Sequence, residues 1–236
     1  SGELHVGHKV EAAVDGARRE AIRNNHSATH LLHASLRQVL GGHVRQSGSL
    51  VTAERLRFDF THFSPLSRLE IQEIEELVNR KIRENLPVET RLTTLEDGVK
   101  EGAIAIFEEK YGEKVRLVAV GDFSKELCGG VHARATGEIG FFKIVSEASI
   151  AAGLRRIEAL TGEGALRYAQ EADELLAEIQ GSLSSPRKDI LAHLEKWRSE
   201  LEEREKEIKA LRQKLAQVRT EGGEERVRKV KGISVL

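Results

Sequence analysis

Apolar residues recur along this chain with two different periods, and these periods predict where helices and strands form. Spacings of three and four residues predict helices over residues 17–40, 67–85, 95–109 and 163–180. Alternating or short apolar segments predict strands over residues 45–51, 55–60, 88–94, 115–120, 139–147 and 154–160. The expected fold class is α+β, with a mixed or antiparallel sheet packed against the helices at 18–40 and 67–85.

Local sequence signals mark the ends of several elements. Ser67 and Glu70 have the spacing of a capping box at the start of a helix. Gly41 and Gly42 are expected to end the first long helix. Residues 1–20 have glycines at positions 2 and 7 followed by an alternating apolar segment, which predicts a strand, a turn and a second strand.

The pattern changes after about residue 163. From Ile190 to Val218, apolar residues step alternately by four and three positions, and only Arg204 interrupts this heptad stripe. We expect an antiparallel helical hairpin, or coiled coil, that acts as a dimerisation arm. The alternative is a helix packed on its own domain.

Composition narrows the class of protein. The chain has 236 residues and a formal net charge of -1, so any contact with RNA must come from a local basic patch. Charged residues make up 32% and aromatic residues 4%, which is typical of a helical protein with a lean core. No apolar run has the length of a membrane span, and no signal peptide opens the chain. The lack of methionine, with Ser1 first, indicates a fragment of a longer protein.

The single cysteine, Cys128, excludes an intramolecular disulfide and favours a reducing, cytoplasmic location. It lies four residues before His132, with Gly129 and Gly130 in between. The glycines let the backbone turn tightly, so that thiolate and imidazole can face one side, and their N–H groups could hold an anion or a carbonyl. The alternative is a glycine-rich loop around a buried, inert cysteine.

A second pair of candidate ligands lies on the first predicted helix. His26 and His30 are four residues apart and share a helix face, as two metal ligands would. No glutamate follows His26, so the general base of the metalloprotease motif is absent. Such a pair alone is more often a surface or core accident, and His33 lies on roughly the same face. Together with Cys128 and His132, the pair offers three nitrogens and one sulfur, which suits tetrahedral Zn²⁺.

Two long segments resemble the editing domain of alanyl-tRNA synthetase, which also occurs in free-standing alanine-tRNA editing proteins. The segments are NNHSATHLLHASLRQVLGGHVRQSGSLVTAERLRFDFTHF and DFSKELCGGVHARATGEIGFFKIVSEASIAAGLRRIEALTG. The resemblance is dense over about residues 20–165, and its paired His-x-x-x-His and Cys-x-x-x-His motifs are highly specific in this context. No segment resembles the class II synthetase motifs or a P-loop, so we do not expect the fragment to activate alanine.

The resemblance implies an aminoacyl-tRNA deacylase that hydrolyses the ester of Ser-tRNA(Ala) and Gly-tRNA(Ala). A synthetic site for alanine needs such editing, because discrimination by one methyl or one hydroxyl is only about 10- to 200-fold. The family's ligands for one Zn²⁺ per chain fall on His26, His30, Cys128 and His132. Thr29 and Gln46 match positions of the editing pocket, and Arg155 and Arg156 match a basic pair that would hold the tRNA end.

The same resemblance divides the chain into four parts. Residues 1–19 would end a preceding β-barrel domain, and residues 20–164 would form the zinc-containing editing domain. Residues 165–222 would form the helical oligomerisation arm, and residues 223–236 would begin a C-terminal domain. The implied partners are alanine tRNA, bound through its aminoacylated 3′ end and acceptor stem, and a second copy of the chain; no membrane is expected.

Val131 departs from the family pattern, which has threonine at this position. Loss of the hydroxyl would weaken activity or serine preference if that threonine binds substrate or water, and would change little if it only packs.

Two alternatives stay open: the related editing domain of threonyl-tRNA synthetase, which acts on Ser-tRNA(Thr), and a zinc-stabilised tRNA-binding and dimerisation module without catalysis. The role of the zinc also stays open, because four protein ligands normally close a structural site, while a catalytic zinc keeps a position for water.

Overall fold

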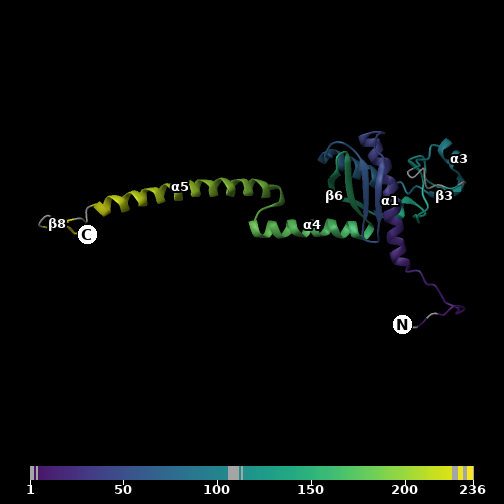
Figure 1. Ribbon diagram of the computed structural model, residues 1–236, viewed down its shortest axis with the longest axis horizontal. Coiled ribbons are helices and arrows are strands. Elements are labelled where there is room, and N and C mark those ends of the chain that lie inside the picture. Colours follow the sequence, from purple (N-terminus) through teal and green to yellow (C-terminus); the bar gives the residue numbers. More distant parts are fainter. Residues whose placement is uncertain are drawn as a thin grey trace. The chain divides into compact units, whose positions relative to one another are not determined.

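The computed structural model describes residues 3, 5–105, 112, 114–224, 228–230 and 233–235. The chain divides into two compact units, Ser1–Gln170 and Glu171–Leu236. The first unit contains two antiparallel sheets and the helices packed on them, and the second contains most of helix α4 and all of helix α5 (Figure 1). The predicted α+β class is confirmed, and among the described strands every pairing is antiparallel.

The larger sheet of the first unit has four strands in the order β1-β2-β7-β6. The strands are β1 (Gln46–Val51), β2 (Leu56–Thr61), β6 (Phe142–Ala151) and β7 (Leu154–Thr161). Leu56, Phe58 and Phe60 of β2 are fully buried, as their alternation with polar residues predicted. The strand predicted at 139–147 begins later, because the preceding residues form a 3-10 turn, η2 (Thr136–Ile139).

Two helices cover one face of this sheet. They are α1 (Gly16–Leu40) and α2 (Arg68–Arg83), and their apolar stripes join the strands in one core. The expected end of α1 is confirmed, since Gly41 has a φ of 115° and donates its N–H to the Arg37 carbonyl. The capping box of α2 is also present, since the Glu70 N–H donates to Ser67 Oγ and the Ser67 N–H donates to the Glu70 carboxylate.

A smaller sheet has three strands in the order β3-β4-β5. They are β3 (Val88–Thr94), β4 (Lys114–Val120) and β5 (Ser124–Leu127), with helix α3 (Leu95–Lys100) after β3. The helix predicted over 95–109 is shorter than expected, because Gly102 adopts a φ of 85° just after it; residues 106–109 lie outside the described part of the chain. Strand β5 was not predicted, because four residues are too few to show an alternation.

Helix α1 lies between the two sheets (Figure 1). It contacts β1, β2 and β7 of the larger sheet and β5 of the smaller one. Its buried residues include polar ones, among them Asn25, Ser27, His30 and His33, at 1–4% exposure. The polar part of this helix therefore faces other protein segments instead of solvent, which is typical of a functional site.

The strand–turn–strand predicted for residues 1–20 is wrong for the described residues. Residues 5–15 contain a turn and no strand, and α1 begins at Gly16, where the Asp15 side chain accepts a hydrogen bond from the Arg18 N–H. The alternating Val10 and Val14 are 67% and 64% exposed. An alternating segment becomes a strand only where a partner takes its backbone hydrogen bonds, and an isolated hairpin is marginal in water.

The second unit is mainly helical. It contains the later part of α4 (Gly162–Leu183), a short 3-10 turn η3 (Arg187–Asp189), and α5 (Ile190–Glu224). The predicted helices at 163–180 and 190–218 are confirmed. Strands β8 (Arg228–Val230) and β9 (Ile233–Val235) pair at the end of the chain. Among the described helices, none has both the length and the apolar character to cross a membrane.

Asn25 joins helix α1 to the larger sheet through hydrogen bonds of its side chain. Its side-chain amide donates to the carbonyls of Thr52 (2.9 Å) and Ala53 (3.2 Å), in the turn between β1 and β2. Its Oδ1 accepts a hydrogen bond from Thr161 Oγ1 of β7 at 2.8 Å. Asn25 therefore joins three segments at the residue before His26.

Replacing Asn25 with alanine should lower the free energy of unfolding by about 1–3 kcal/mol, because buried carbonyls lose their donors. Urea unfolding followed by circular dichroism measures the change. Asn24→Ala is the matched control, because the Asn24 Oδ1 has no hydrogen-bond partner among the described residues. Equal losses in the two variants would contradict this role of Asn25.

Candidate metal centre

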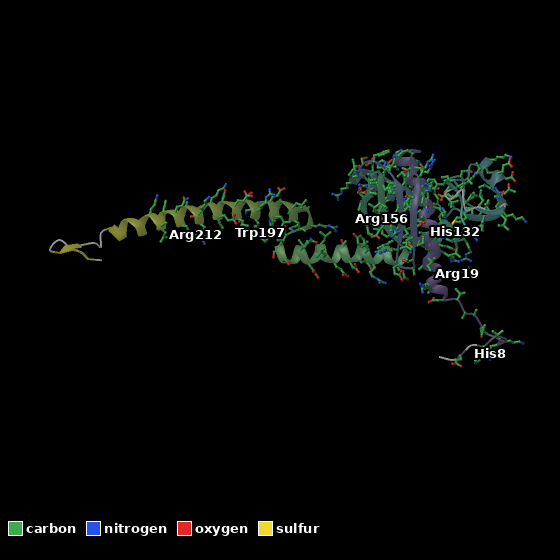
Figure 2. The ribbon with its side chains drawn as sticks, in the orientation of Figure 1. His8, Arg19, His132, Arg156, Trp197 and Arg212 are labelled. Carbon is green, nitrogen blue, oxygen red and sulfur yellow. The ribbon has the colours of Figure 1, made fainter. Side chains whose placement is uncertain are left out.

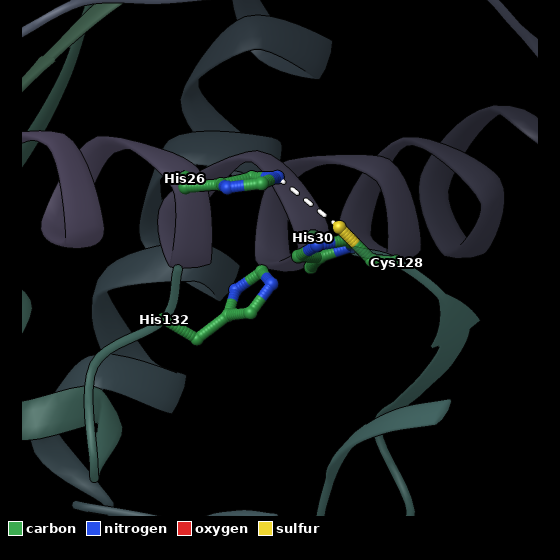
Figure 3. Close-up of side chains that lie close together, drawn as sticks. All are labelled: His26, His30, Cys128 and His132. Atoms are coloured by element: carbon green, nitrogen blue, oxygen red, sulfur yellow. Dashed lines mark hydrogen bonds between the residues drawn. The ribbon is translucent and has the colours of Figure 1, made fainter. Parts of the chain in front are cut away.

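His26 and His30 of α1 meet Cys128 and His132 of the loop after β5 (Figure 3). One ligand atom from each residue lies within 4.8 Å of the other three. The His26 Nε2 and Cys128 Sγ atoms are 3.3 Å apart, and the ring centroids of His26 and His132 are 4.4 Å apart. The structure thus brings together two pairs that are about a hundred positions apart in sequence.

These donors fit a zinc ion in number, type and spacing. Tetrahedral zinc with Zn–N distances of about 2.0–2.1 Å and a Zn–S distance of about 2.3 Å places its ligand atoms roughly 3.3–3.7 Å apart. The candidate ligand atoms, all within 4.8 Å of one another, are close to that spacing. Among the described residues, the buried His30 Nε2 and both ring nitrogens of His132 have no hydrogen-bond partner. Unpartnered buried nitrogens are rare, and coordination would satisfy one on each ring.

The charge state of the cysteine also suits a metal ligand. Burial raises the pKa of the Cys128 thiol, but the surrounding imidazoles of His132, His26 and His30 outweigh burial and lower this pKa to about 3. The Gly130 N–H adds a weaker hydrogen bond to Cys128 Sγ at 3.5 Å. Cys128 is therefore a thiolate at neutral pH, and the thiolate is the form that binds metal.

The metal-free cluster holds a positive charge on His30 beside this thiolate. Burial lowers the pKa of His30, but the Glu126 carboxylate and the Cys128 thiolate outweigh burial and raise it to about 10. Burial lowers the pKa of His132, which keeps that ring neutral. Metal binding therefore requires His30 to release its proton, whereas Cys128 and His132 are already in the ligand form.

Hydrogen bonds at both ends hold the ligand loop, residues 128–134. At its start, the Cys128 N–H donates to the Arg116 carbonyl of β4 at 2.9 Å, and Arg116 Nε donates to the Cys128 carbonyl at 3.1 Å. Past His132, the Ala133 N–H donates to the Ser27 hydroxyl of α1 at 2.9 Å. Ser27 is next to His26, so this bond sets the loop directly against the ligand-bearing helix.

Gly130 is required for a reason different from the expected one. The sequence analysis attributed Gly129 and Gly130 to backbone freedom, but neither adopts a positive φ. Instead, a Cβ atom on Gly130 would overlap the His26 ring, whereas a Cβ atom on Gly129 would meet no atom within 4 Å. The His26 ring lies against the Gly130 backbone, and the missing side chain makes room for it.

The other predicted site residues lie outside the four-residue cluster. Thr29 is buried, and its hydroxyl donates to the Asn25 carbonyl at 2.9 Å. Gln46 is half-buried at the start of β1, and its side-chain amide donates to Ser49 Oγ at 3.1 Å. Val131 is half-buried within the ligand loop. Catalytic roles for Thr29 and Gln46 stay predictions.

The predicted basic pair, Arg155 and Arg156, lies on β7 with both guanidinium groups already paired. Arg155 is 8% exposed and donates to the Glu147 carboxylate at 2.5 Å. Arg156 donates twice to Asp59, at 2.7 and 2.8 Å. Neighbouring strand residues point to opposite faces, so the two arginines do not form one patch. Figure 2 shows Arg156 on the larger sheet and His132 beside α1. A tRNA contact stays a prediction for each arginine.

Glu126 was not among the residues predicted from the sequence, and the role of His33 was left open there. The Glu126 carboxylate contacts the Nδ1 atoms of both His30 and His33, and His33 is not among the four clustered ligands. A signal was available in the spacing, because Glu126 lies only two residues before Cys128 in the chain.

Gly130→Ala should strongly weaken zinc binding and leave the fold intact, because the new methyl group displaces the His26 ring. Competition with a chromophoric chelator measures zinc affinity, and circular dichroism monitors the fold. Gly129→Ala is the matched control and should bind zinc as the unsubstituted chain does. If the two variants bind zinc equally, His26 is not held against Gly130 as described.

Part of this chain matches a known protein family. Residues 115–158 match the family described as "Threonyl and Alanyl tRNA synthetase second additional domain". This segment contains Cys128 and His132 but not the histidines of α1. The family description covers enzymes for two amino acids and does not choose between them.

The relatives similar over the whole chain are alanine–tRNA ligases. The chain is 51% identical over 236 residues to that of Nitrosomonas europaea and 50% identical over 236 residues to that of Pelotomaculum thermopropionicum. It is 49% identical to that of Fervidobacterium nodosum over 215 residues, or 91% of this chain. The chain spans 27% of the length of the first two relatives and 25% of the third. It is thus similar along its whole length to a segment of the alanyl-tRNA synthetases, and the resemblance identified in the sequence is confirmed.

Proposed function

We propose that this chain edits tRNA, hydrolysing the ester bond of Ser-tRNA(Ala) and Gly-tRNA(Ala). The observation that carries the proposal is the cluster of four candidate metal ligands in a chain that is similar over its whole length to alanine–tRNA ligases. Because the chain spans 27% of those relatives' length, ligase activity is not proposed for it.

The donors His26, His30, Cys128 and His132 would hold one Zn²⁺. When bound, this ion supplies a Lewis acid that can polarise the ester carbonyl or a water molecule. Four protein donors reach the same point, so we infer that the centre chiefly positions the aminoacylated end of the tRNA. Among the other residues, we propose that the Gln46 amide and the Thr29 hydroxyl orient the amino acid or the attacking water.

One observation favours alanine tRNA over threonine tRNA. The relatives that match the whole chain, including helices α4 and α5, are alanine–tRNA ligases. The family that matches residues 115–158 includes threonyl enzymes too, but it covers a short part of the chain. Val131 supports the remaining alternative, a tRNA-binding module without catalysis, because the hydroxyl expected beside the metal is absent.

The zinc-loaded chain should release serine from Ser-tRNA(Ala) faster than from Ser-tRNA(Thr), because tRNA identity selects the substrate. Release of labelled serine measures both rates, and Cys128→Ala should lose activity through loss of a metal ligand. The complete alanine–tRNA ligase of Nitrosomonas europaea, tested in parallel, controls for contributions from the parts of that enzyme outside the segment that matches this chain. Preference for Ser-tRNA(Thr) would support the threonyl alternative, and binding without release would support the non-catalytic one.

We also propose that α5 pairs with α5 of a second copy of the chain. Its heptad stripe is exposed: Leu194 is 45% exposed, Trp197 51%, Leu201 60%, Ile208 50%, Leu211 51%, Leu215 62% and Val218 66%. Figure 2 shows Trp197 on this helix. An exposed apolar seam of this kind, interrupted here only by Arg204, is the usual contact surface of a coiled coil.

Replacing Leu201 and Leu211 together with glutamate should convert a dimer into a monomer, because two charges enter the apolar seam. Multi-angle light scattering measures the mass. Ser199→Glu with Gln213→Glu is the matched control, since it adds the same charge at exposed positions off the stripe. A monomeric unsubstituted chain, or a double leucine variant that stays dimeric, would refute pairing through α5.

A further inference from the structure

Glu126 is a buried carboxylate held between two histidines of α1. It is 1% exposed, and its Oε2 lies 2.7 Å from His30 Nδ1. Its Oε1 lies 3.0 Å from His33 Nδ1 and accepts a hydrogen bond from Ser124 Oγ at 3.3 Å. Both carboxylate oxygens are therefore satisfied, as a buried charge requires.

The geometry sets the hydrogen-bonding state of the His30 ring. A carboxylate accepts hydrogen bonds and does not donate them, so the proton between His30 and Glu126 belongs to Nδ1. The neutral His30 ring then has its lone pair on Nε2. This Nε2 atom is buried and has no hydrogen-bond partner among the described residues. It is therefore the atom that His30 can offer to a metal.

The position of the carboxylate is itself held by the core. The His33 ring is 1% exposed and lies 5.3 Å, centroid to centroid, from the Phe58 ring of the larger sheet. Glu126 belongs to β5 of the smaller sheet. The carboxylate of β5 thus contacts a histidine of α1 whose ring packs against the larger sheet. Strand β5 also leads directly to Cys128.

We propose that Glu126 is a positioning residue of the metal centre, which orients His30 so that Nε2 faces the other three ligands. His33 holds the opposite oxygen of the same carboxylate and keeps it in place. The inference rests on the proposed metal binding by the four-residue cluster. In zinc proteins, loss of a carboxylate behind a histidine ligand typically lowers metal affinity about 10- to 100-fold.

Glu126→Gln tests this role, because it keeps the side-chain volume and removes the symmetric acceptor. Zn²⁺ affinity is measured by chelator competition, ligand geometry by the visible absorption of the Co²⁺-loaded chain, and stability by thermal unfolding without metal. We expect Zn²⁺ affinity to fall about 10- to 100-fold and the Co²⁺ bands to shift. Glu126→Asp, which keeps the carboxylate, should recover part of the affinity.

Glu75→Gln is the matched control. The Glu75 carboxylate also links two elements, accepting hydrogen bonds from Lys143 Nζ (2.9 Å) and the Ile144 N–H (3.0 Å), but it does not contact the ligands. Its loss should lower stability and leave Zn²⁺ affinity and the Co²⁺ spectrum unchanged. A purely structural role for Glu126 predicts that both variants behave in this way.

The outcomes separate this inference from the proposed metal site. If the unsubstituted chain binds zinc and Glu126→Gln binds it equally with the same Co²⁺ spectrum, the positioning role is overturned and the metal site stands. If the unsubstituted chain binds no zinc, both are overturned. If Glu126→Gln does not fold, His33→Gln replaces it; a smaller loss of affinity supports the proposal, and no loss overturns it.

Discussion

The contact between helix α1 and the ligand loop is the interaction on which the candidate site depends. It is made by the Ser27 hydroxyl, which accepts the Ala133 N–H, and by the His26 ring, which lies against Gly130. Without this contact, the two ligand pairs would be separate, and neither pair alone makes a zinc site. Because α1 also packs on the larger sheet, the position of the histidines is tied to the main core.

Charge explains why this contact needs further support. The site gathers a thiolate at Cys128 and a carboxylate at Glu126 in a largely buried place, and isolated buried charges are costly. Burial raises the pKa of Glu126, but His30 and His33 outweigh burial and hold it well below its usual range. His30 therefore has two roles in the proposed site, because it contacts both charged groups and is a candidate nitrogen ligand, whereas His33 contacts only the carboxylate. A divalent cation would complete the balance on the thiolate side.

The second unit follows a different physical rule. The first unit has a buried apolar core of its own, whereas α5 exposes a regular apolar stripe from Leu194 onward. An isolated amphipathic helix gains most of its stability from packing on a partner, so such a stripe is a surface for association. The chain thus combines a unit that bears the four candidate metal ligands with a helix for which we propose a partner helix.

The sequence alone determined the features that depend on neighbouring residues. The helix and strand periods predicted α1, α2, β2 and β3, and the capping box at Ser67 predicted the start of α2. The single cysteine of the chain indicated Cys128 as a candidate ligand. The tertiary structure decided what depends on residues far apart in the chain. His30 and Glu126 are 96 positions apart, so no local pattern could pair them, and only the packing of β5 against α1 does so. For the same reason, the ion pair of Arg156 with Asp59, the need for glycine at 130 and the absence of a strand within residues 5–15 became visible only once the partner segments were in place.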